Sequence, residues 1–242
     1  MTSDYWNRES GFYDRQWKGS LVSEFDYACT KDVLFRFLEP SMNDNILEIG
    51  CGLGTWTGLV GCKCRAITAL DISKEMIRKA RKNVKIRGVR FVASDFLFFR
   101  TKERFNKILA VRSFEYLDDT KAGLRKVWGM LKPNGKFVII TKSKPCAWEF
   151  VYHERWKRDG FRQNKVSCIK MKKLLRSAGF MDIKTLPVIL RFPIFHGGNM
   201  EIPLIPNSAA KYLLMPGLVL RGSRFLIPFA ESYAICATRG GS

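Results

Sequence analysis

Three glycines at alternate positions, Gly50, Gly52 and Gly54, are the first residues whose spacing suggests chemistry. They follow a short apolar run that contains one acidic residue, Glu48. Glycine permits a strand to turn sharply into a helix while its backbone lies against a ligand. The dinucleotide-binding fingerprint requires glycine or alanine three positions after the second glycine, and here that position is Thr55. The turn therefore predicts a ligand site and disfavours a nicotinamide enzyme.

Two aspartates follow later apolar runs of the same kind. Asp71 ends one run, in Leu70-Asp71-Ile72-Ser73, and Asp95 precedes Phe96 after the next. A carboxylate is well suited to accept hydrogen bonds from two hydroxyls. Ligands of doubly wound sheets bind at the carboxyl ends of the strands, which is where these residues would lie. The alternative for both aspartates is a local role as caps or turn residues.

The elements that must position these residues alternate between strand and helix patterns. Short apolar runs predict strands, and apolar residues at helical spacing predict the helices between them. Ser73 is a suitable N-cap for one such helix. This alternation implies an α/β fold, with a doubly wound, mostly parallel sheet and helices on both faces. The expected strands are 45–49, 65–70, 89–93, 107–111, 137–141, 181–189 and 231–238, and the expected helices include 27–38, 73–84, a segment around 124–131 and about 169–178.

The stretch Ile46 to Thr55 resembles motif I of the class I S-adenosylmethionine-dependent methyltransferases, and later features follow in that family's order. Residues 112–117, Arg-Ser-Phe-Glu-Tyr-Leu, stand where the family commonly has a loop ending in Glu-His-Leu, with Tyr116 in place of the histidine. Residues 131–135 and 177–180 resemble the family's turns before strands five and six. The resemblance covers residues 30–141, and more weakly 168–189 and 231–238.

This resemblance implies S-adenosylmethionine as the cofactor and a seven-stranded, Rossmann-like sheet whose last strand is antiparallel. Asp71 would hold both ribose hydroxyls, and Asp95 would accept a hydrogen bond from the adenine amino group beside an apolar contact from Phe96. Arg112 would lie by the cofactor, the alternative being a surface charge. The implied cofactor-binding residues are Glu48, Gly50, Gly52, Gly54, Asp71, Ile72, Asp95, Phe96 and Arg112.

The strand–helix rhythm is interrupted in three places. Residues 1–26 are rich in aromatic and charged residues and are expected to form an N-terminal arm or lid. Residues 27–242 would form the methyltransferase domain, with insertions at about 142–167 and 190–230 that cap the substrate site. No internal repeat or low-complexity linker divides the chain.

Composition bounds the remaining possibilities. Lys and Arg exceed Asp and Glu by 42 to 22, and a net charge of +20 attracts nucleic acid, anionic lipid surfaces or acidic small molecules without choosing among them. Seven scattered cysteines do not suggest a disulfide framework, and two histidines make a metal site improbable. No apolar stretch reaches the roughly 18 residues of a membrane span. We therefore expect a cytoplasmic protein, with peripheral membrane association open and the oligomeric state undetermined.

Methyl transfer from a sulfonium is an in-line displacement whose leaving group is already activated. The enzyme mainly positions the nucleophile and excludes water, so a general base is needed only if the nucleophile must lose a proton. The candidates for catalysis are Glu115, Tyr116, His153 and His196.

The first hypothesis for the acceptor is a small, largely apolar or lipid-like molecule methylated on oxygen or carbon. Residues 211–230 are both apolar and basic, as expected for a pocket roof or a segment on an anionic membrane. The second is RNA or another polyanion, since residues 156–162 interleave aromatic and basic side chains. No Asn-Pro-Pro-aromatic motif follows the fourth strand, which disfavours the amino-directed nucleic-acid branch. A third is a non-catalytic partner protein that binds the cofactor.

Overall fold

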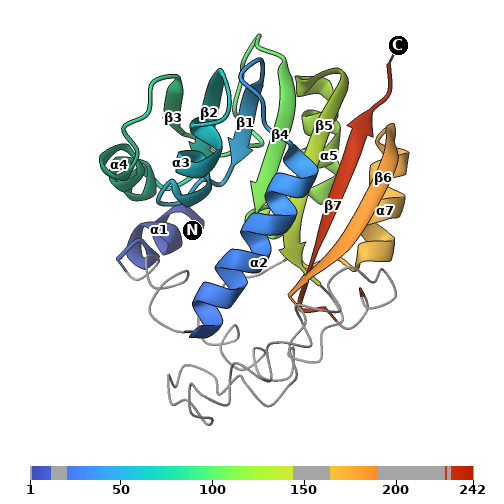
Figure 1. Cartoon of the computed structure of the whole chain (residues 1–242), viewed down its shortest axis with the longest axis horizontal. Coiled ribbons are helices and arrows are strands. Elements are labelled where there is room, and N and C mark those ends of the chain that lie inside the picture. Colours follow the sequence, from blue (N-terminus) through green and yellow to red (C-terminus); the bar gives the residue numbers. More distant parts are fainter. Residues whose placement is uncertain (1, 12–20, 144–163, 190–226, 228–229, 242) are drawn as a thin grey trace.

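The computed structural model describes residues 2–11, 21–143, 164–189, 227 and 230–241. These residues form a seven-stranded sheet in the order β3-β2-β1-β4-β5-β7-β6 (Figure 1). The first five strands in this order, from β3 to β5, run parallel to one another, and β7 is antiparallel to both β5 and β6. The strands are β1 (Asn45–Ile49), β2 (Ala66–Asp71), β3 (Val89–Ala93), β4 (Phe105–Val111), β5 (Leu131–Lys142), β6 (Phe180–Ile189) and β7 (Ser232–Arg239).

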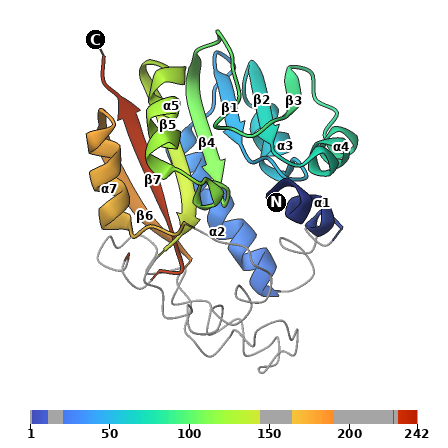
Figure 2. The same ribbon diagram turned by 180° about the vertical axis from the view of Figure 1, so that it is seen from behind.

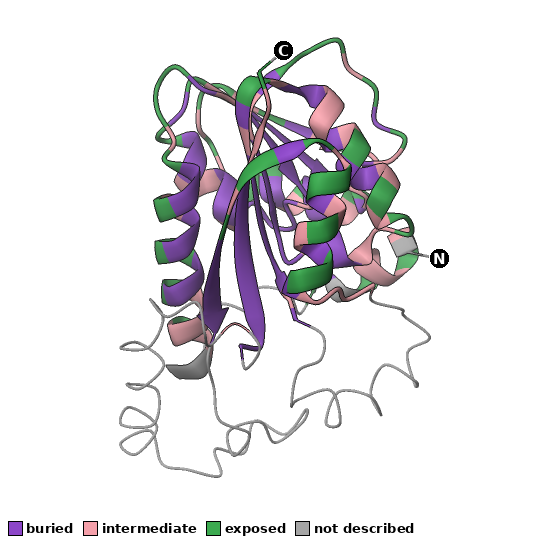
Figure 3. Ribbon diagram, turned by 90° about the vertical axis from the view of Figure 1, so that its right-hand side faces the viewer, coloured by how far each residue is buried: buried purple, intermediate pink, exposed green. Residues whose placement is uncertain are grey.

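Helices cover both faces of this sheet. On one face α2 (Leu21–Leu38) and α3 (Thr55–Gly61) bury their apolar side chains against the middle strands, and α4 (Lys74–Asn83) packs over β2 and β3. On the other face lie α5 (Thr120–Met130) and α7 (Cys168–Ser177), which are in front when the molecule is seen from behind (Figure 2). Figure 3 shows that the strands between the helix layers are largely buried. The expected α/β, doubly wound, mostly parallel architecture is confirmed.

Most expected elements are present within one or two residues, but β5 begins at Leu131 and not at Phe137, so the expected turn over 131–135 lies within this strand. Helix α2 also begins six residues earlier than expected. The sequence pattern placed its start at Tyr27, whereas the helix begins at Leu21. The predicted boundary of the N-terminal arm at residue 26 therefore falls inside α2. A second short helix, α1 (Thr2–Glu9), lies before it, where no helix was expected.

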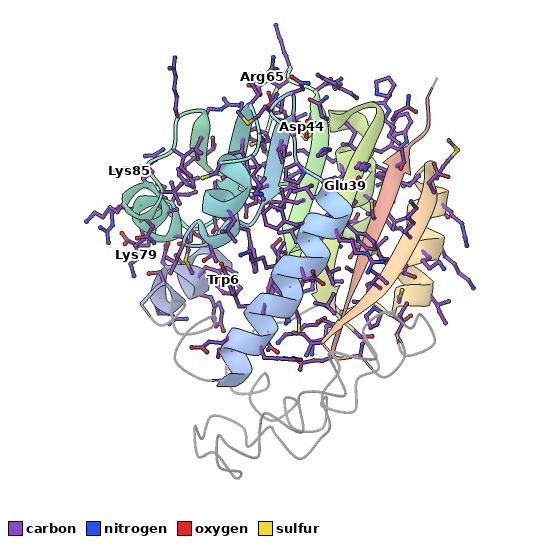
Figure 4. All side chains as sticks on the ribbon, in the orientation of Figure 1. Trp6, Glu39, Asp44, Arg65, Lys79 and Lys85 are labelled. Carbon is purple, nitrogen blue, oxygen red and sulfur yellow. The ribbon has the colours of Figure 1, made fainter. Side chains whose placement is uncertain are left out.

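Ion pairs fix the ends of the strands opposite the glycine loop. The Lys107 Nζ at β4 lies 2.6 Å from the Asp44 carboxylate before β1, and it donates to the Glu39 carbonyl oxygen just after α2. The Lys136 ammonium pairs with the Glu39 carboxylate. Glu39 and Asp44 lie together at the end of α2 in Figure 4. These contacts tie the end of α2 to the strands β1, β4 and β5.

Several expectations fall wholly or partly outside the described residues. The two predicted caps, at about 142–167 and 190–230, are described only at 142–143, 164–167, 227 and 230. Within the described residues no helix is long and apolar enough to cross a membrane. The six cysteines in this part of the chain are all free thiols.

Candidate active site

A cavity of about 770 Å³, part of it open to solvent, lies at the carboxyl ends of β1, β2, β3 and β4. The lining comes from five places in the chain. These are the N-terminal helix, the glycine loop, the end of β2 with the start of α4, the turn after β3 and the loop after β4.

Gly50 and Gly52 line the cavity with bare backbone. Both have positive φ angles, 73° and 53°. A Cβ at Gly50 would lie 2.3 Å from the Cβ of Ser113, so only glycine allows the loops after β1 and β4 to meet here. The Ser113 hydroxyl also donates a hydrogen bond to the Ile49 carbonyl oxygen, at 2.5 Å.

The third glycine of the motif has a different place. Gly54 also has a positive φ, 83°, but it faces helix α4, where a Cβ would come within 2.9 Å of Val84. Its small size lets the start of α3 pack against α4. Gly54 does not line the cavity, so the cavity lining does not support its predicted contact with the cofactor.

Asp71 ends β2 at one side of the cavity. Its Oδ2 accepts a hydrogen bond from the Gly52 amide at 2.8 Å, and its Oδ1 accepts one from the Ser73 amide at 2.9 Å. Burial raises the pKa of this carboxyl, and the amide hydrogen bonds oppose that rise. Each carboxylate oxygen retains the capacity to accept a further hydrogen bond, so Asp71 is held in place with room for a ligand's hydroxyls.

The turn after β3 contributes the opposite wall. Asp95 Oδ1 accepts a hydrogen bond from the Leu97 amide at 2.8 Å, which fixes the turn that presents Phe96. The Phe96 side chain is buried, with the Lys126 ammonium 5.4 Å from its ring centroid. Asp95 therefore stabilises its own turn and also lines the cavity.

Arg112 follows β4 in a left-handed backbone conformation, with φ of 53°. Its amide donates to the Ile140 carbonyl oxygen at 2.8 Å. Its side chain is 7% exposed and lines the cavity, so the alternative of a surface charge is wrong. One guanidinium nitrogen lies 3.5 Å from the Ser232 hydroxyl at the start of β7. The guanidinium thus extends from the cavity toward the ends of β5 and β7.

Ionisable groups gather at this end of the sheet. Burial lowers the pKa of Lys142, at the end of β5, to about 8. The carboxylate of Glu231 opposes this, whereas the nearby cations Arg112 and Lys165 add to it. Glu115 belongs to the same group, and its buried Oε2 accepts a hydrogen bond from the Thr141 hydroxyl at 2.8 Å. Glu115 therefore faces the ends of the strands and does not line the cavity.

Glu48 lies beneath the glycine loop, also outside the cavity lining. It is 1% exposed, and its Oε2 accepts a hydrogen bond from the Thr57 hydroxyl at 2.5 Å. Burial raises the pKa of this carboxyl to about 7; the Thr57 hydrogen bond lowers it and the charge of Asp71 raises it further. The other oxygen, Oε1, is buried without a hydrogen-bond partner in the described residues. This oxygen is therefore able to accept a hydrogen bond from a bound water or ligand.

Trp6 of α1 also lines the cavity, which the sequence reasoning did not foresee. Its ring meets the ring of Tyr116 edge to face, with centroids 5.0 Å apart and an interplanar angle of 79°. Asn7 anchors the helix, because its Oδ1 accepts a hydrogen bond from the Ser73 hydroxyl at 2.6 Å. Lys79 of α4 donates to the Ser10 carbonyl oxygen at 2.7 Å. Helix α1 thus closes one side of the cavity, from α4 to the loop after β4.

The predicted site residues now divide into three groups. Seven of the nine predicted cofactor residues line one cavity, as does Tyr116 among the catalytic candidates. Glu48, Gly54 and Glu115 support the loops from behind. His153 and His196 lie outside the described residues. The described part of the chain holds no group of three or more side chains able to bind a metal ion.

Comparisons with known proteins agree with this geometry. The family model described as "Methyltransferase domain" matches residues 46–135, from β1 to the start of β5. Residues 46–135 form a class I S-adenosylmethionine-dependent methyltransferase domain. The cofactor of this family is S-adenosylmethionine, so the expected fold, family and cofactor are confirmed.

Individual relatives of the methyltransferase domain are distant. The chain is 33% identical over 99 residues to malonyl-[acyl-carrier protein] O-methyltransferase of Priestia megaterium, covering 40% of this chain and 36% of that protein. It is 28% identical over 181 residues to O-methyltransferase cnsE of Penicillium expansum, covering 72% and 64%. The chain thus spans less than two thirds of the length of these curated relatives.

A solved structure extends the similarity of the methyltransferase domain to the whole fold. N-methyltransferase NodS from Bradyrhizobium japonicum, in complex with S-adenosyl-L-homocysteine, superimposes with a TM-score of 0.67 at 17% identity. The match covers 100% of this chain and 99% of that one. At this identity the likeness establishes the fold.

Proposed function

We propose that this protein transfers a methyl group from S-adenosylmethionine to a small-molecule acceptor. The observation that carries the proposal is the cavity where bare glycine backbone, an anchored carboxylate and the Asp95–Phe96 turn meet. These groups match the chemistry of a nucleoside, which has a sugar with two hydroxyls and a flat base with an amino group.

Each lining residue has a defined part in holding the cofactor. Asp71 would accept the ribose hydroxyls, because its two oxygens are fixed by amides and retain free lone pairs. Asp95 would accept from the adenine amino group, with Phe96 and Ile72 in contact with the base. Gly50 and Gly52 would bring backbone close to the amino-acid part, with Glu48 beneath them.

The bound cofactor would supply an activated methyl group on sulfur. The protein would orient the acceptor against this methyl group and exclude water from the site. The acceptor's lone pair forms the new bond to the methyl carbon as the carbon–sulfur bond breaks, and the electron pair of that bond stays on sulfur. A hydroxyl or acidic carbon on the acceptor also loses a proton, which passes to solvent through the open side of the cavity. Trp6 and Tyr116 narrow the cavity at the acceptor side and exclude water there.

We propose that the acceptor is largely apolar or lipid-like and is methylated on oxygen or carbon. Trp6, Tyr116 and Leu117 give this part of the cavity an apolar wall, and Arg112 is the one cation among the described lining residues. An acceptor with an apolar body and a polar group would suit this surface. The relatives from Priestia megaterium and Penicillium expansum are both O-methyltransferases, which supports the choice of oxygen.

Calorimetry with S-adenosylhomocysteine tests the cofactor site. Asp71→Asn removes the charge that would bind the ribose, and we expect the affinity to fall by roughly 10- to 100-fold, as for the loss of a charge-assisted hydrogen bond. Asp182→Asn makes the same change on an exposed part of β6 and should leave the affinity unchanged. Absence of heat with the wild-type protein would refute the proposed cofactor site.

Methyl-labelled cofactor tests the acceptor. The purified protein is incubated with labelled S-adenosylmethionine and a fractionated cell extract, and label is followed into lipid-extractable small molecules, RNA and protein. We expect label in the first fraction. Label in RNA would favour a polyanion acceptor, and cofactor binding with no labelled product would favour a non-catalytic partner protein.

A further inference from the structure

A second concave surface lies away from the active site, where α4 meets the edge strand β3. This groove is lined by four cations, Arg81, Lys85, Arg87 and Arg90, and by apolar side chains between them. It lies at the amino end of β3, whereas the active-site cavity lies at the carboxyl ends of the strands. The two are separated by roughly 15 Å, the length of the ten-residue helix α4.

The segment around the groove carries a large part of the protein's charge. Residues 74–104 contain eleven Lys and Arg against three Asp and Glu, a net +8 of the +20 of the whole chain. Lys85, Arg87 and Arg100 are exposed to solvent. Figure 4 shows Lys79 on α4 and Lys85 in the loop that follows this helix. This concentration makes the α4–β3 edge a strong anion-attracting surface.

Some of these charges are used inside the protein. Arg78 pairs with Glu75 at 2.9 Å and Arg90 with Glu103 at 2.7 Å, and both pairs are exposed. Arg81 donates to the Phe91 carbonyl oxygen at 2.9 Å. Among the described residues no carboxylate lies within ion-pair distance of Lys85 or Arg87. These two side chains, in the loop between α4 and β3, are therefore available for phosphates.

The groove offers more than charge. Val84, Ile86 and Val89 are only partly buried and form an apolar surface between the cations. A single strand exposes the apolar faces of its bases to such side chains, while the cations beside them contact the backbone phosphates. A duplex keeps its bases inside and would use only the charges.

We propose that the α4–β3 groove binds a single-stranded segment of nucleic acid. Lys85 and Arg87 contact successive phosphates, and the bases lie over the apolar side chains between α4 and β3. The groove is too far from the cavity to present the reacting atom, so it holds the protein on the strand while methyl transfer takes place elsewhere. This binding does not depend on the proposed function.

Fluorescence anisotropy with a labelled 20-nucleotide oligouridylate tests the inference. Lys85→Ala/Arg87→Ala should weaken binding about tenfold at 0.1 M salt. The slope of log affinity against log salt should fall by about 1.4, since each phosphate contact on a single strand contributes about 0.7. An oligothymidylate arm shows whether RNA or DNA is preferred, and a duplex of equal length should bind more weakly.

A matched variant separates a local site from net charge. Lys170→Ala/Lys173→Ala removes two exposed cations from α7, beside the opposite edge of the sheet, and should bind the oligonucleotide like the wild type. An equal loss of oligonucleotide affinity in both double variants would overturn the proposal. It would also be overturned if Lys85→Ala/Arg87→Ala bound the oligonucleotide normally and lost only its binding to phosphatidylserine vesicles. Unchanged melting temperatures and unchanged binding of S-adenosylhomocysteine show that both variants are folded.

Discussion

Gly50 is the residue at which the glycine loop touches the loop after β4. An added Cβ would lie 2.3 Å from the Ser113 Cβ, and φ of 73° is strained for any residue with a side chain. We therefore expect Gly50→Ala to lower the free energy of unfolding by at least about 2 kcal/mol, since backbone strain alone costs roughly 1–2 kcal/mol. Urea denaturation of both proteins measures this.

The control for this substitution is Gly129→Ala. Gly129 lies within α5, and a Cβ there would meet nothing within 4 Å. Because alanine is favoured over glycine in a helix, this variant should be more stable than the wild type by roughly 0.5–1 kcal/mol. If both variants had the same midpoint, the argument from close approach at Gly50 would fail.

Glu48 gives the protein a defined dependence on pH. Its pKa is raised to about 7 in the folded protein from 4.5, so between these values the folded chain holds a proton that the unfolded chain has released. The free energy of unfolding must therefore fall as pH rises from 4.5 to 7 and level off above 7, by up to about 3 kcal/mol. Glu48→Gln keeps a neutral group beside Thr57 and should lack this decline.

Chemical denaturation at pH 5 and pH 8 measures the difference. The stability of Glu48→Gln relative to the wild type should rise between the two pH values. Glu24→Gln, on an exposed part of α2, should follow the wild type. A relative stability of Glu48→Gln that is constant with pH would show that this carboxyl does not hold its proton near neutrality.

At the scale of elements, α1 is the helix whose position most affects the cavity. It is held by the Ser73–Asn7 hydrogen bond of 2.6 Å and by Lys79, and it places Trp6 against Tyr116. Asn7→Ala should weaken S-adenosylhomocysteine binding about 5- to 10-fold, the equivalent of the roughly 1 kcal/mol of one hydrogen bond, by loosening the helix over the cavity. Arg8→Ala, exposed on the same helix, should bind normally in the same titration.

The central elements were predictable because their patterns are local. β1 and β3 have the expected bounds, and Ser73 caps α4 by accepting from the Met76 amide. The start of α2 was missed because Leu21–Asp26 has no clear apolar face. The position of β7 between β5 and β6 is a long-range pairing that the chain's own periodicity does not contain, and the family resemblance implied only that the last strand is antiparallel.

In the candidate site too, local patterns predicted some residues, and long-range packing placed the others. Residues that follow strands, such as Asp71 and Asp95, could be placed because parallel strands end at one edge of a sheet. Trp6 could not, since the contact of its ring with Tyr116, and the hydrogen bond of the neighbouring Asn7 with Ser73, join residues more than sixty positions apart. Gly54 shows a further limit. One motif contains glycines that face the cavity and one that faces a helix, and only packing distinguishes them.

At the scale of the whole molecule, the distribution of charge is uneven. Residues 21–73 contain seven Asp and Glu against four Lys and Arg, whereas residues 74–104 carry a net +8. The acidic part includes groups paired at the strand ends, such as Asp44 with Lys107, and these partly buried pairs are screened little by salt. The exposed cations near α4 and β3 repel one another and are screened strongly.

This repulsion predicts that the protein becomes more stable as salt is added. Raising sodium chloride from 0.02 to 0.3 M shortens the Debye length to below about 10 Å and relieves the self-repulsion of a net +20. We expect the melting temperature to rise by about 2–4 °C, the equivalent of roughly 1 kcal/mol in a chain of this size. Lys85→Ala/Arg87→Ala starts with less repulsion in the basic segment, so its rise should be smaller, whereas a melting temperature that falls with salt in both proteins would mean that screened ion pairs outweigh the repulsion.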